Sequence, residues 1–275
     1  MEVNFYNFLK DRSSAFLNHE FNGQIKPVKY KKYASKIELY DQGKCIVCAK
    51  VKSKNYVEFA SESSFVYPYD TCIFIDNPYV IDNLERYDVL YHSMYRGDDE
   101  GLSRTIITSE DIKDRDEILC DLLTNREKKN YFDDLEIQNK FKDIFEQINK
   151  IVPGEFSKNP DGYFYVDDGA SLSVKNLATG SKLFFIIKKL LLNGLIDNTT
   201  MLILDEPESH LHPEWINKFA EILAFLVKKV NVNVLLTTHS PNLMLALNVY
   251  ADKMDIIDKS HFYLAEKMEN EYFSN

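Results

Sequence analysis

The pattern of apolar and polar residues divides the chain into stretches of different period. Between residues 36 and 60, apolar and polar residues alternate in the segments KIELY, CIVCAKV and YVEFA, with turn residues between them. A period of two is typical of half-buried strands, and the short turns predict an antiparallel meander. Residues 71–75 (TCIFI) form a continuous apolar run that ends at Asp76-Asn77-Pro78, which predicts a buried strand followed by a turn.

Residues 109–150 are rich in charge and have a helical period instead. Apolar residues recur near every third or fourth position from Phe132 to Ile148, and Pro153-Gly154 then stops the helix. This stretch is either a helix that packs on the domain or an inserted arm that binds a partner.

Strands and helices alternate from residue 156 onward. The predicted strands are Tyr163–Val166, Leu172–Val174, Met201–Leu204, Val232–Leu236 and His261–Ala265, and the predicted helices are Ser181–Leu192, Pro213–Lys229 and Pro241–Tyr250. Two fully apolar strands separated by a helix indicate a parallel sheet covered on both faces. We therefore predict an α/β fold with an antiparallel β-containing part (1–108), a helical segment (109–155) and an α/β lobe (156–275).

Composition narrows the class of protein. The 275-residue chain has a formal net charge of −10, which argues against a surface that is basic throughout and gives no support for nucleic-acid binding. Cys45 and Cys48 have the spacing of half a zinc site, but no second pair completes it, so packing within a strand is favoured over metal or redox chemistry. No apolar run approaches the ~20 residues needed to cross a bilayer. We expect a cytoplasmic protein with reduced thiols and no membrane contact.

Two adjacent carboxylates end the apolar run Met201 to Leu204. A buried parallel strand that ends in Asp205-Glu206 brings both acids to the carboxyl edge of the sheet, where α/β folds bind ligands. One carboxylate there suits a hydrated Mg²⁺ ion, and the next can orient or deprotonate an attacking water. The alternative is a pair of solvated turn residues, which the apolar run before the pair and Pro207 after it make less favoured.

Histidines follow both of the fully apolar strands. His239 follows the strand Val232–Leu236 after two threonines, at the edge that carries Asp205 and Glu206, where it can hydrogen-bond a terminal phosphate or a water. His210 and His212 have the spacing of a metal-binding pair, but they precede a helix and lack a nearby third ligand. A loop role is favoured over metal for these two.

Gly180 and Ser181 come at the start of a predicted helix. Free backbone amides and the dipole at a helix N-terminus favour an anion, and Ser181 can also cap the helix. An ordinary capped helix and an anion site are both compatible with this segment alone.

Together, the segments LATGSK, LILDEP and TTHSP resemble the ABC-type ATPase heads of the structural-maintenance-of-chromosomes, RecF-like and overcoming-lysogenization-defect groups, often labelled AAA-family or AAA_21-type ATPases. The resemblance covers about residues 170–250 and implies a P-loop NTPase-like fold that uses ATP and Mg²⁺. It implies that Asp205 holds Mg²⁺ through water, that Glu206 is the general base and that His239 senses the terminal phosphate. LATGSK matches the signature segment, in which Thr179, Gly180 and Ser181 contact the nucleotide held by a second head of a dimer.

The sequence departs from this family in one respect. The phosphate-cradling loop has the pattern GxxxxGK[ST], known as Walker A. The only Gly-Lys pair is Gly43-Lys44, with Glu38 at the position of the first glycine and Cys45 at the last position. The first strand and its phosphate loop are therefore expected to be missing from this chain, which then needs them from a longer product or a partner.

Three hypotheses follow from these residues. The first is an ATPase head that acts as a dimer or with a Walker A-bearing partner, and the second is a non-catalytic module that docks on such a partner. The third is a metal-dependent nuclease that uses Asp205, Glu206, His210 and His212. It is less favoured because the sequence supplies no further acidic cluster at a defined spacing. DNA repair and antiphage defence both use heads of this type, and nucleic acid enters as a partner by this analogy alone.

Overall fold

The computed structural model describes residues 35–41, 44–53, 56–61, 71–87, 115–124 and 137–264, with side chains from residue 71 onward. The chain divides into two compact units, one formed by Met1–Pro68 and Arg96–Ile118 and the other by Tyr69–Tyr95 and Leu119–Asn275. All the candidate site residues belong to the second unit.

The described part of the first unit is an antiparallel sheet of three strands. β1 (Ser35–Asp41), β2 (Lys44–Ser53) and β3 (Tyr56–Ser61) pair in the order β1-β2-β3. The strands match the three alternating segments, so the predicted meander is confirmed. Cys45 and Cys48 both lie within β2.

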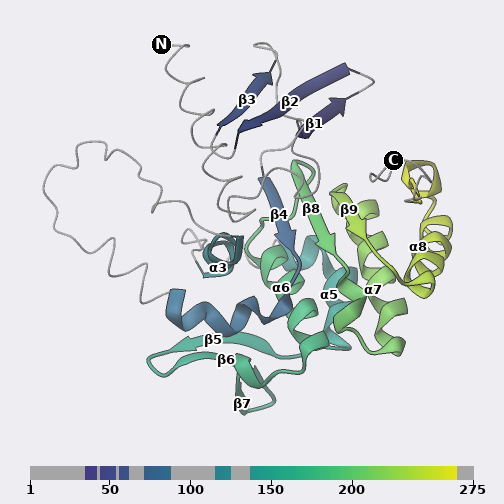
Figure 1. Ribbon diagram of the computed structural model, residues 1–275. Helices are drawn as coiled ribbons and strands as arrows, with labels where there is room; N and C mark the ends of the chain where they lie inside the picture. The colour runs from purple at the N-terminus through teal and green to yellow at the C-terminus, as the bar shows by residue number, and fades with distance from the viewer. Residues whose placement is uncertain are drawn as a thin grey trace, which may run out of the picture. The chain divides into compact units, whose positions relative to one another are not determined.

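The second unit contains a parallel sheet at its centre. β4 (Thr71–Ile75), β8 (Thr200–Asp205) and β9 (Asn233–Thr237) pair in the order β4-β8-β9 (Figure 1). Ile75 is in register with Leu204, and Leu204 with Leu236, so the carboxyl ends of the three strands lie at one edge. The predicted parallel arrangement of the two apolar strands is confirmed, and β4 extends it.

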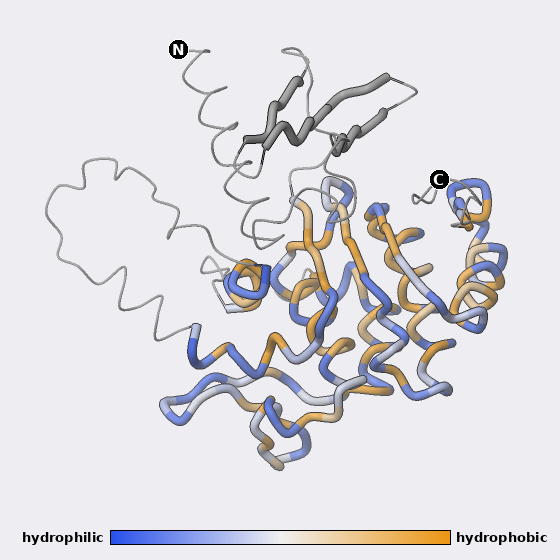
Figure 2. The backbone as a smooth tube through the Cα atoms, in the orientation of Figure 1, coloured by the Kyte–Doolittle hydropathy of each residue, from blue (hydrophilic) through white to orange (hydrophobic). Residues whose placement is uncertain are grey.

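One face of this sheet is buried against helices. Ile73, Leu202 and Leu204 are at most 1% exposed and share a hydrophobic core with residues of α5 (Lys142–Asn149), α6 (Thr179–Leu192) and α7 (Pro213–Phe225). Figure 2 shows hydrophobic residues along the strands and along the helices beside them. A parallel sheet flanked by helices fits the P-loop NTPase-like fold expected from the sequence.

The opposite face of the sheet is more exposed. Met201 and Ile203 are half-buried, and Leu235, which pairs with Ile203, is 51% exposed. Cover on both faces was expected from the apolar runs. In the described ranges, the well-buried residues of β8 lie on one face only.

The helical segment packs on the core where it is described. It contains α3 (Arg115–Thr124), a helical stretch at 137–140 and α5, whereas residues 125–136 lie outside the described ranges. Ile144, Phe145 and Ile148 of α5 are buried in the core of the second unit. Of the two alternatives for this stretch, α5 therefore fits the helix that packs on the domain.

A second antiparallel sheet is formed by β5 (Glu155–Asn159), β6 (Gly162–Asp167) and β7 (Ala170–Ser173). Asp168 and Gly169 both have positive φ in the tight turn between β6 and β7, a conformation that Asp-Gly pairs favour. The buried Lys188 of α6 donates to the carbonyls of Val152 and Gly154 just before β5. Burial lowers the pKa of this lysine, although the carboxylates of Glu155 and Asp167 oppose the shift.

The final predicted strand is wrong. Residues 261–264 have no regular structure, and Ala265 lies outside the described residues. Phe262, Tyr263 and Leu264 are 45%, 88% and 76% exposed, so their apolar side chains are not packed as in a strand of the core. Strand-like composition does not make a strand without a neighbour to complete the hydrogen-bond ladder.

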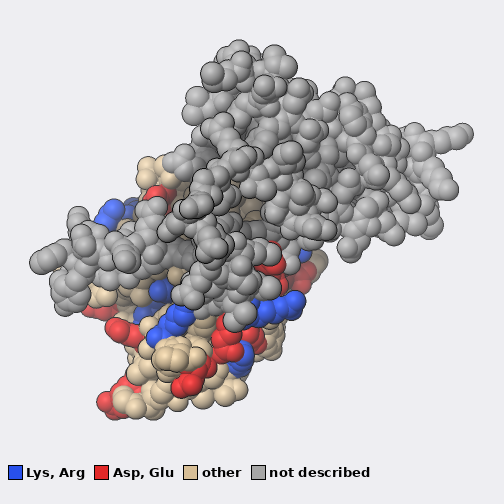
Figure 3. Space-filling model, turned by 90° about the vertical axis from the view of Figure 1, so that its left-hand side faces the viewer, with Lys and Arg blue, Asp and Glu red and all other residues tan. Residues whose placement is uncertain are grey.

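The chain continues after β9 into α8 (Pro241–Lys253), which packs against α7. Figure 3 shows acidic and basic side chains intermingled over the visible part of the described surface. In the described part of the chain, no helix combines the length and apolar character needed to cross a membrane.

Candidate functional site

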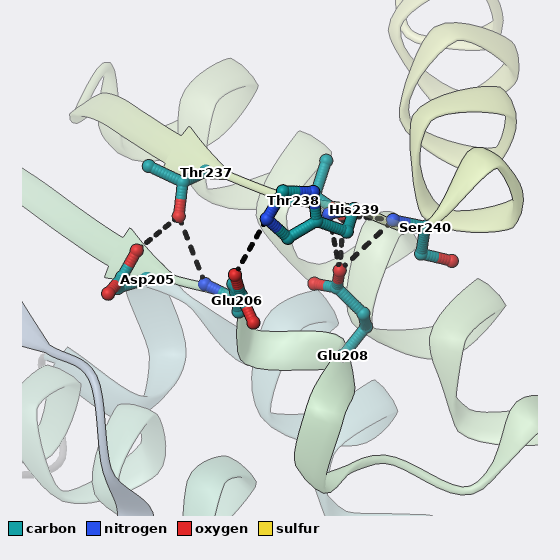
Figure 4. Close-up of polar contacts among 7 residues, drawn as sticks. All are labelled: Asp205, Glu206, Glu208, Thr237, Thr238, His239 and Ser240. Carbon is teal, nitrogen blue, oxygen red and sulfur yellow. Dashed lines mark hydrogen bonds and ion pairs between the residues drawn. The ribbon is translucent and has the colours of Figure 1, made fainter.

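The ends of β8 and β9 bring Asp205 next to Thr237. The two residues are in register across the parallel pair, and the Thr237 hydroxyl donates to the Asp205 carboxylate (Figure 4). Asp205 is exposed at the carboxyl edge of the sheet. Its oxygens are the kind of ligand that Mg²⁺ prefers, and an exposed edge leaves room for the waters that Mg²⁺ retains.

Glu206 turns the chain sharply after β8. Its φ and ψ are 45° and 48°, in the left-handed region that non-glycine residues seldom occupy. The Glu206 N–H donates to the Thr237 carbonyl at 3.1 Å and to its hydroxyl at 3.2 Å, which ties the turn to β9. A strained backbone persists only where its surroundings hold it, and such residues are concentrated at functional sites.

This turn directs the Glu206 side chain toward His239. Glu206 Oε1 lies 3.0 Å from His239 Nε2, and the two side chains are 47% and 88% exposed (Figure 4). The structure therefore brings Asp205, Glu206 and His239 to one edge, as the strand order predicts. A carboxylate and an imidazole in contact at an exposed edge can together orient a water and exchange a proton with it.

The loop that carries His239 is anchored by a residue that the sequence analysis missed. Glu208 lies in the short 3-10 helix Pro207–His210, and its Oε1 accepts bonds from the Thr238 hydroxyl and from the backbone N–H groups of His239 and Ser240. The Ser240 hydroxyl in turn accepts from Leu243 N and caps α8. Glu208 follows Glu206 by two residues, but nothing in the sequence indicated its partners.

Thr179, Gly180 and Ser181 form the first turn of α6. The helix begins two residues earlier than predicted, and Ala178 precedes it without a side-chain cap, so Ser181 does not act as the cap that the sequence allowed. The Thr179 hydroxyl lies 2.7 Å from the Tyr79 hydroxyl. Thr179 and Ser181 are half-buried, whereas Gly180 is buried.

Gly180 is needed where α6 meets the loop that follows the acid pair. A Cβ added at Gly180 would lie 2.9 Å from two carbons of the Trp215 ring and 3.0 Å from the His210 carbonyl oxygen. Packing alone therefore explains this glycine. The signature candidate and the Asp205-Glu206 loop are in contact through this packing.

A buried lysine fixes the same turn of α6. Lys182, 1% exposed, donates to Asp82 at 2.5 Å and to the Lys175 carbonyl at 3.1 Å, and its ammonium lies 4.8 Å from the centre of the Tyr79 ring. Asp82 and Tyr79 belong to the 3-10 helix Pro78–Asn83 that follows β4. The segment after β4 thus positions the N-terminus of α6.

The histidine pair His210 and His212 has structural contacts. His212 Nδ1 accepts from Glu214 N and caps α7, while the His210 ring meets the Tyr79 ring edge-on. Over the part of the chain that the structure describes, no group of three or more His, Cys, Asp or Glu residues could hold a metal ion. These contacts support the loop role over a metal-binding pair.

A family model described as "AAA domain, putative AbiEii toxin, Type IV TA system" matches residues 77–246. The match spans 170 residues, more than half of the 275-residue chain, and includes every candidate site residue. No curated protein matches the chain.

Proposed function

The chain belongs to this AAA domain family, which indicates nucleotide binding and ATPase function, and we propose that Asp205, Glu206 and His239 form the hydrolytic part of an ATP site. The 3.0 Å contact between Glu206 and His239, beside Asp205, carries the proposal. Domains of this type use a nucleotide and usually Mg²⁺.

Each residue has a role that its position supports. Asp205, exposed at the end of β8, would hold Mg²⁺. Glu206 orients the attacking water and accepts its proton, and His239 contacts the terminal phosphate. Bound Mg²⁺ neutralises the charge that develops on the phosphate oxygens. The left-handed turn at Glu206 supports its role because it aims the carboxylate along the edge rather than into the sheet.

Within this family, the chain is an ABC-type head like those of the structural-maintenance-of-chromosomes, RecF-like and overcoming-lysogenization-defect groups. It has no phosphate loop of its own. A Walker A-bearing segment or partner head would then complete the site. Two features of the sheet support this. β9 pairs with β8 on one side and, among the described strands, with none on the other, and Leu235 on β9 is 51% exposed. A strand added beside β9 would lie next to Thr237, which pairs with Asp205 of β8 on its other side.

The N-terminus of α6 is the candidate contact with a nucleotide held by that second head. Its first amides have no side-chain cap, and its dipole favours an anion. Ser181, which is half-buried, supplies the hydroxyl at this end. Gly180 contributes its backbone and the close approach of Trp215 rather than an exposed surface.

Hydrolysis of ATP by the full chain with Mg²⁺ and a peptide that carries GxxxxGK[ST], compared with Glu206→Gln under the same conditions, tests the catalytic proposal. Loss of the general base should slow turnover by about 100-fold or more. Glu214→Gln is the matched control, because the Glu214 side chain is 85% exposed in the first turn of α7 and should leave the rate unchanged. Equal rates for Glu206→Gln and the wild type would count against catalysis.

A synthetic strand–loop–helix peptide that carries GxxxxGK[ST] tests completion of the site. Added to the chain, it should strengthen ATP binding in calorimetry, and Leu235→Lys should weaken that effect. Leu172→Lys is the control, since Leu172 is similarly exposed (41%) on β7 of a different sheet. Equal effects of both substitutions would exclude the β9 edge as the docking site.

The second candidate function is a non-catalytic module that docks on an ATPase partner, which the lack of a GxxxxGK[ST] pattern in the sequence favours. Calorimetry with ATP and Mg²⁺ but no peptide separates the two. Micromolar binding by the chain alone would exclude the non-catalytic module.

A further inference from the structure

Glu208 links the segment that carries Glu206 to the loop that carries His239. Its Oε1 accepts from the Thr238 hydroxyl at 2.5 Å, from His239 N at 3.0 Å and from Ser240 N at 3.2 Å (Figure 4). One carboxylate oxygen thus holds three successive residues of the loop. Three hydrogen bonds to one oxygen restrain the loop at consecutive residues, so this is a firm anchor.

The anchor lies in the same short segment as Glu206. Pro207, which is buried and has a restricted φ, separates Glu206 from Glu208 at the start of the 3-10 helix. The position of His239 relative to Glu206 is therefore held by this turn, by the bonds of Glu206 N to Thr237 and by the bonds of Glu208. The His239 side chain is 88% exposed, so packing contributes little to its placement.

We propose that Glu208 is a positioning residue that holds the His239 imidazole at hydrogen-bonding distance from the Glu206 carboxylate. The proposal rests on the proposed function, because the pair it positions is the proposed hydrolytic pair. Glu208 contacts neither the nucleotide nor the reacting water and acts through the backbone of the loop.

The length and the acceptor oxygen of Glu208 are both needed. Aspartate is one methylene shorter and does not reach the three donors, whereas glutamine keeps the same length and an oxygen that can accept them. Glu208 Oε2 is buried, and no residue that the structure describes forms a hydrogen bond with it. Only Oε1 makes the anchoring bonds, so glutamine should replace glutamate with little displacement of the loop.

Nuclear magnetic resonance of the His239 ring measures this positioning without any enzyme assay. In the wild type, Glu206→Gln should shift the ring ¹H–¹³C signal of His239, which His239→Gln identifies among the six histidines. In Glu208→Ala and Glu208→Asp backgrounds the same replacement should leave the signal unchanged. In Glu208→Gln and in the control Glu214→Ala most of the shift should remain.

An equal shift in the Glu208→Asp background would overturn the proposal. Glu208→Asp gives this decision even where Glu208→Ala does not fold, and thermal unfolding of each variant reports on folding. In hydrolysis assays, Glu208→Asp should lower kcat by about 10- to 100-fold with a smaller effect on KM, since a displacement of about 1 Å costs on this order. Glu208→Gln should restore kcat.

The two proposals can fail separately. A His239 shift that depends on Glu208, in a chain whose hydrolysis is unaffected by Glu206→Gln, would refute the proposed function alone. Hydrolysis that depends on Glu206, with a His239 shift that is independent of Glu208, would refute the positioning role alone.

Discussion

Gly180→Ala should destabilise the second unit because its new methyl group meets the Trp215 ring. The added Cβ would lie 2.9 Å from Trp215 Cε3 and Cζ3. The ring is held on one side by a T-shaped contact with the Phe184 ring, with 5.9 Å between centroids at 84°. Overpacking of this kind costs about 1–3 kcal/mol. Alanine recovers about 1 kcal/mol through its better helix propensity, so we expect a net loss of about 0–2 kcal/mol.

A double-mutant cycle separates this clash from other effects of the substitution. In a Trp215→Ala background the ring is absent, and only the His210 carbonyl remains close to the added methyl, at 3.0 Å. There, Gly180→Ala should cost nothing or stabilise the unit slightly. The cost of Gly180→Ala should differ between the two backgrounds by about 0.5–3 kcal/mol, the range found for residues in contact.

Urea unfolding followed by circular dichroism measures all four variants. Ser181→Ala is the control in the same helical turn, because Ser181 does not cap α6, and its effect should be the same in both backgrounds. An equal cost of Gly180→Ala with and without the Trp215 ring would refute the packing explanation. The glycine would then have to be explained by its backbone conformation or by a ligand.

Three further predictions concern residues around the site. Glu206→Gly should be more stable than Glu206→Ala by about 1 kcal/mol in urea unfolding, because φ is +45°; the reverse order would contradict the left-handed turn. Asp82→Ala should cost about 3–5 kcal/mol because it leaves the buried Lys182 ammonium without its carboxylate, whereas Lys182→Met should cost less; equal costs in thermal unfolding would contradict this. Burial raises the pKa of the Asp197 carboxyl, but hydrogen bonds from Thr199 and Thr200 outweigh burial and hold the pKa below 3.8. The ionised carboxylate therefore stabilises the folded state above about pH 4, and this contribution is lost as the pH falls through the pKa of the folded state. Asp197→Asn should remove this contribution to the loss of stability in acid, and an unchanged profile of stability against pH would exclude the contribution.

The sequence by itself determined the elements that carry the site. Apolar runs specify β4, β8 and β9 because strands buried in a parallel sheet need apolar side chains. Since parallel strands end at the same edge, the residues after β8 and β9 were expected to meet, and Glu206 and His239 do. The period of the α5 region likewise predicted a helix with one buried face.

The tertiary structure alone decided how these residues meet. The left-handed turn at Glu206, the anchor at Glu208 and the contact of Gly180 with Trp215 join residues that are distant in the chain. Their geometry depends on strand register and on the packing of α6 against the loop after β8. Local patterns cannot encode such contacts, because each residue is compatible with several partners until the whole unit is packed. The same reason explains why the segment at residues 261–264 is no strand: among the described strands, none pairs with it.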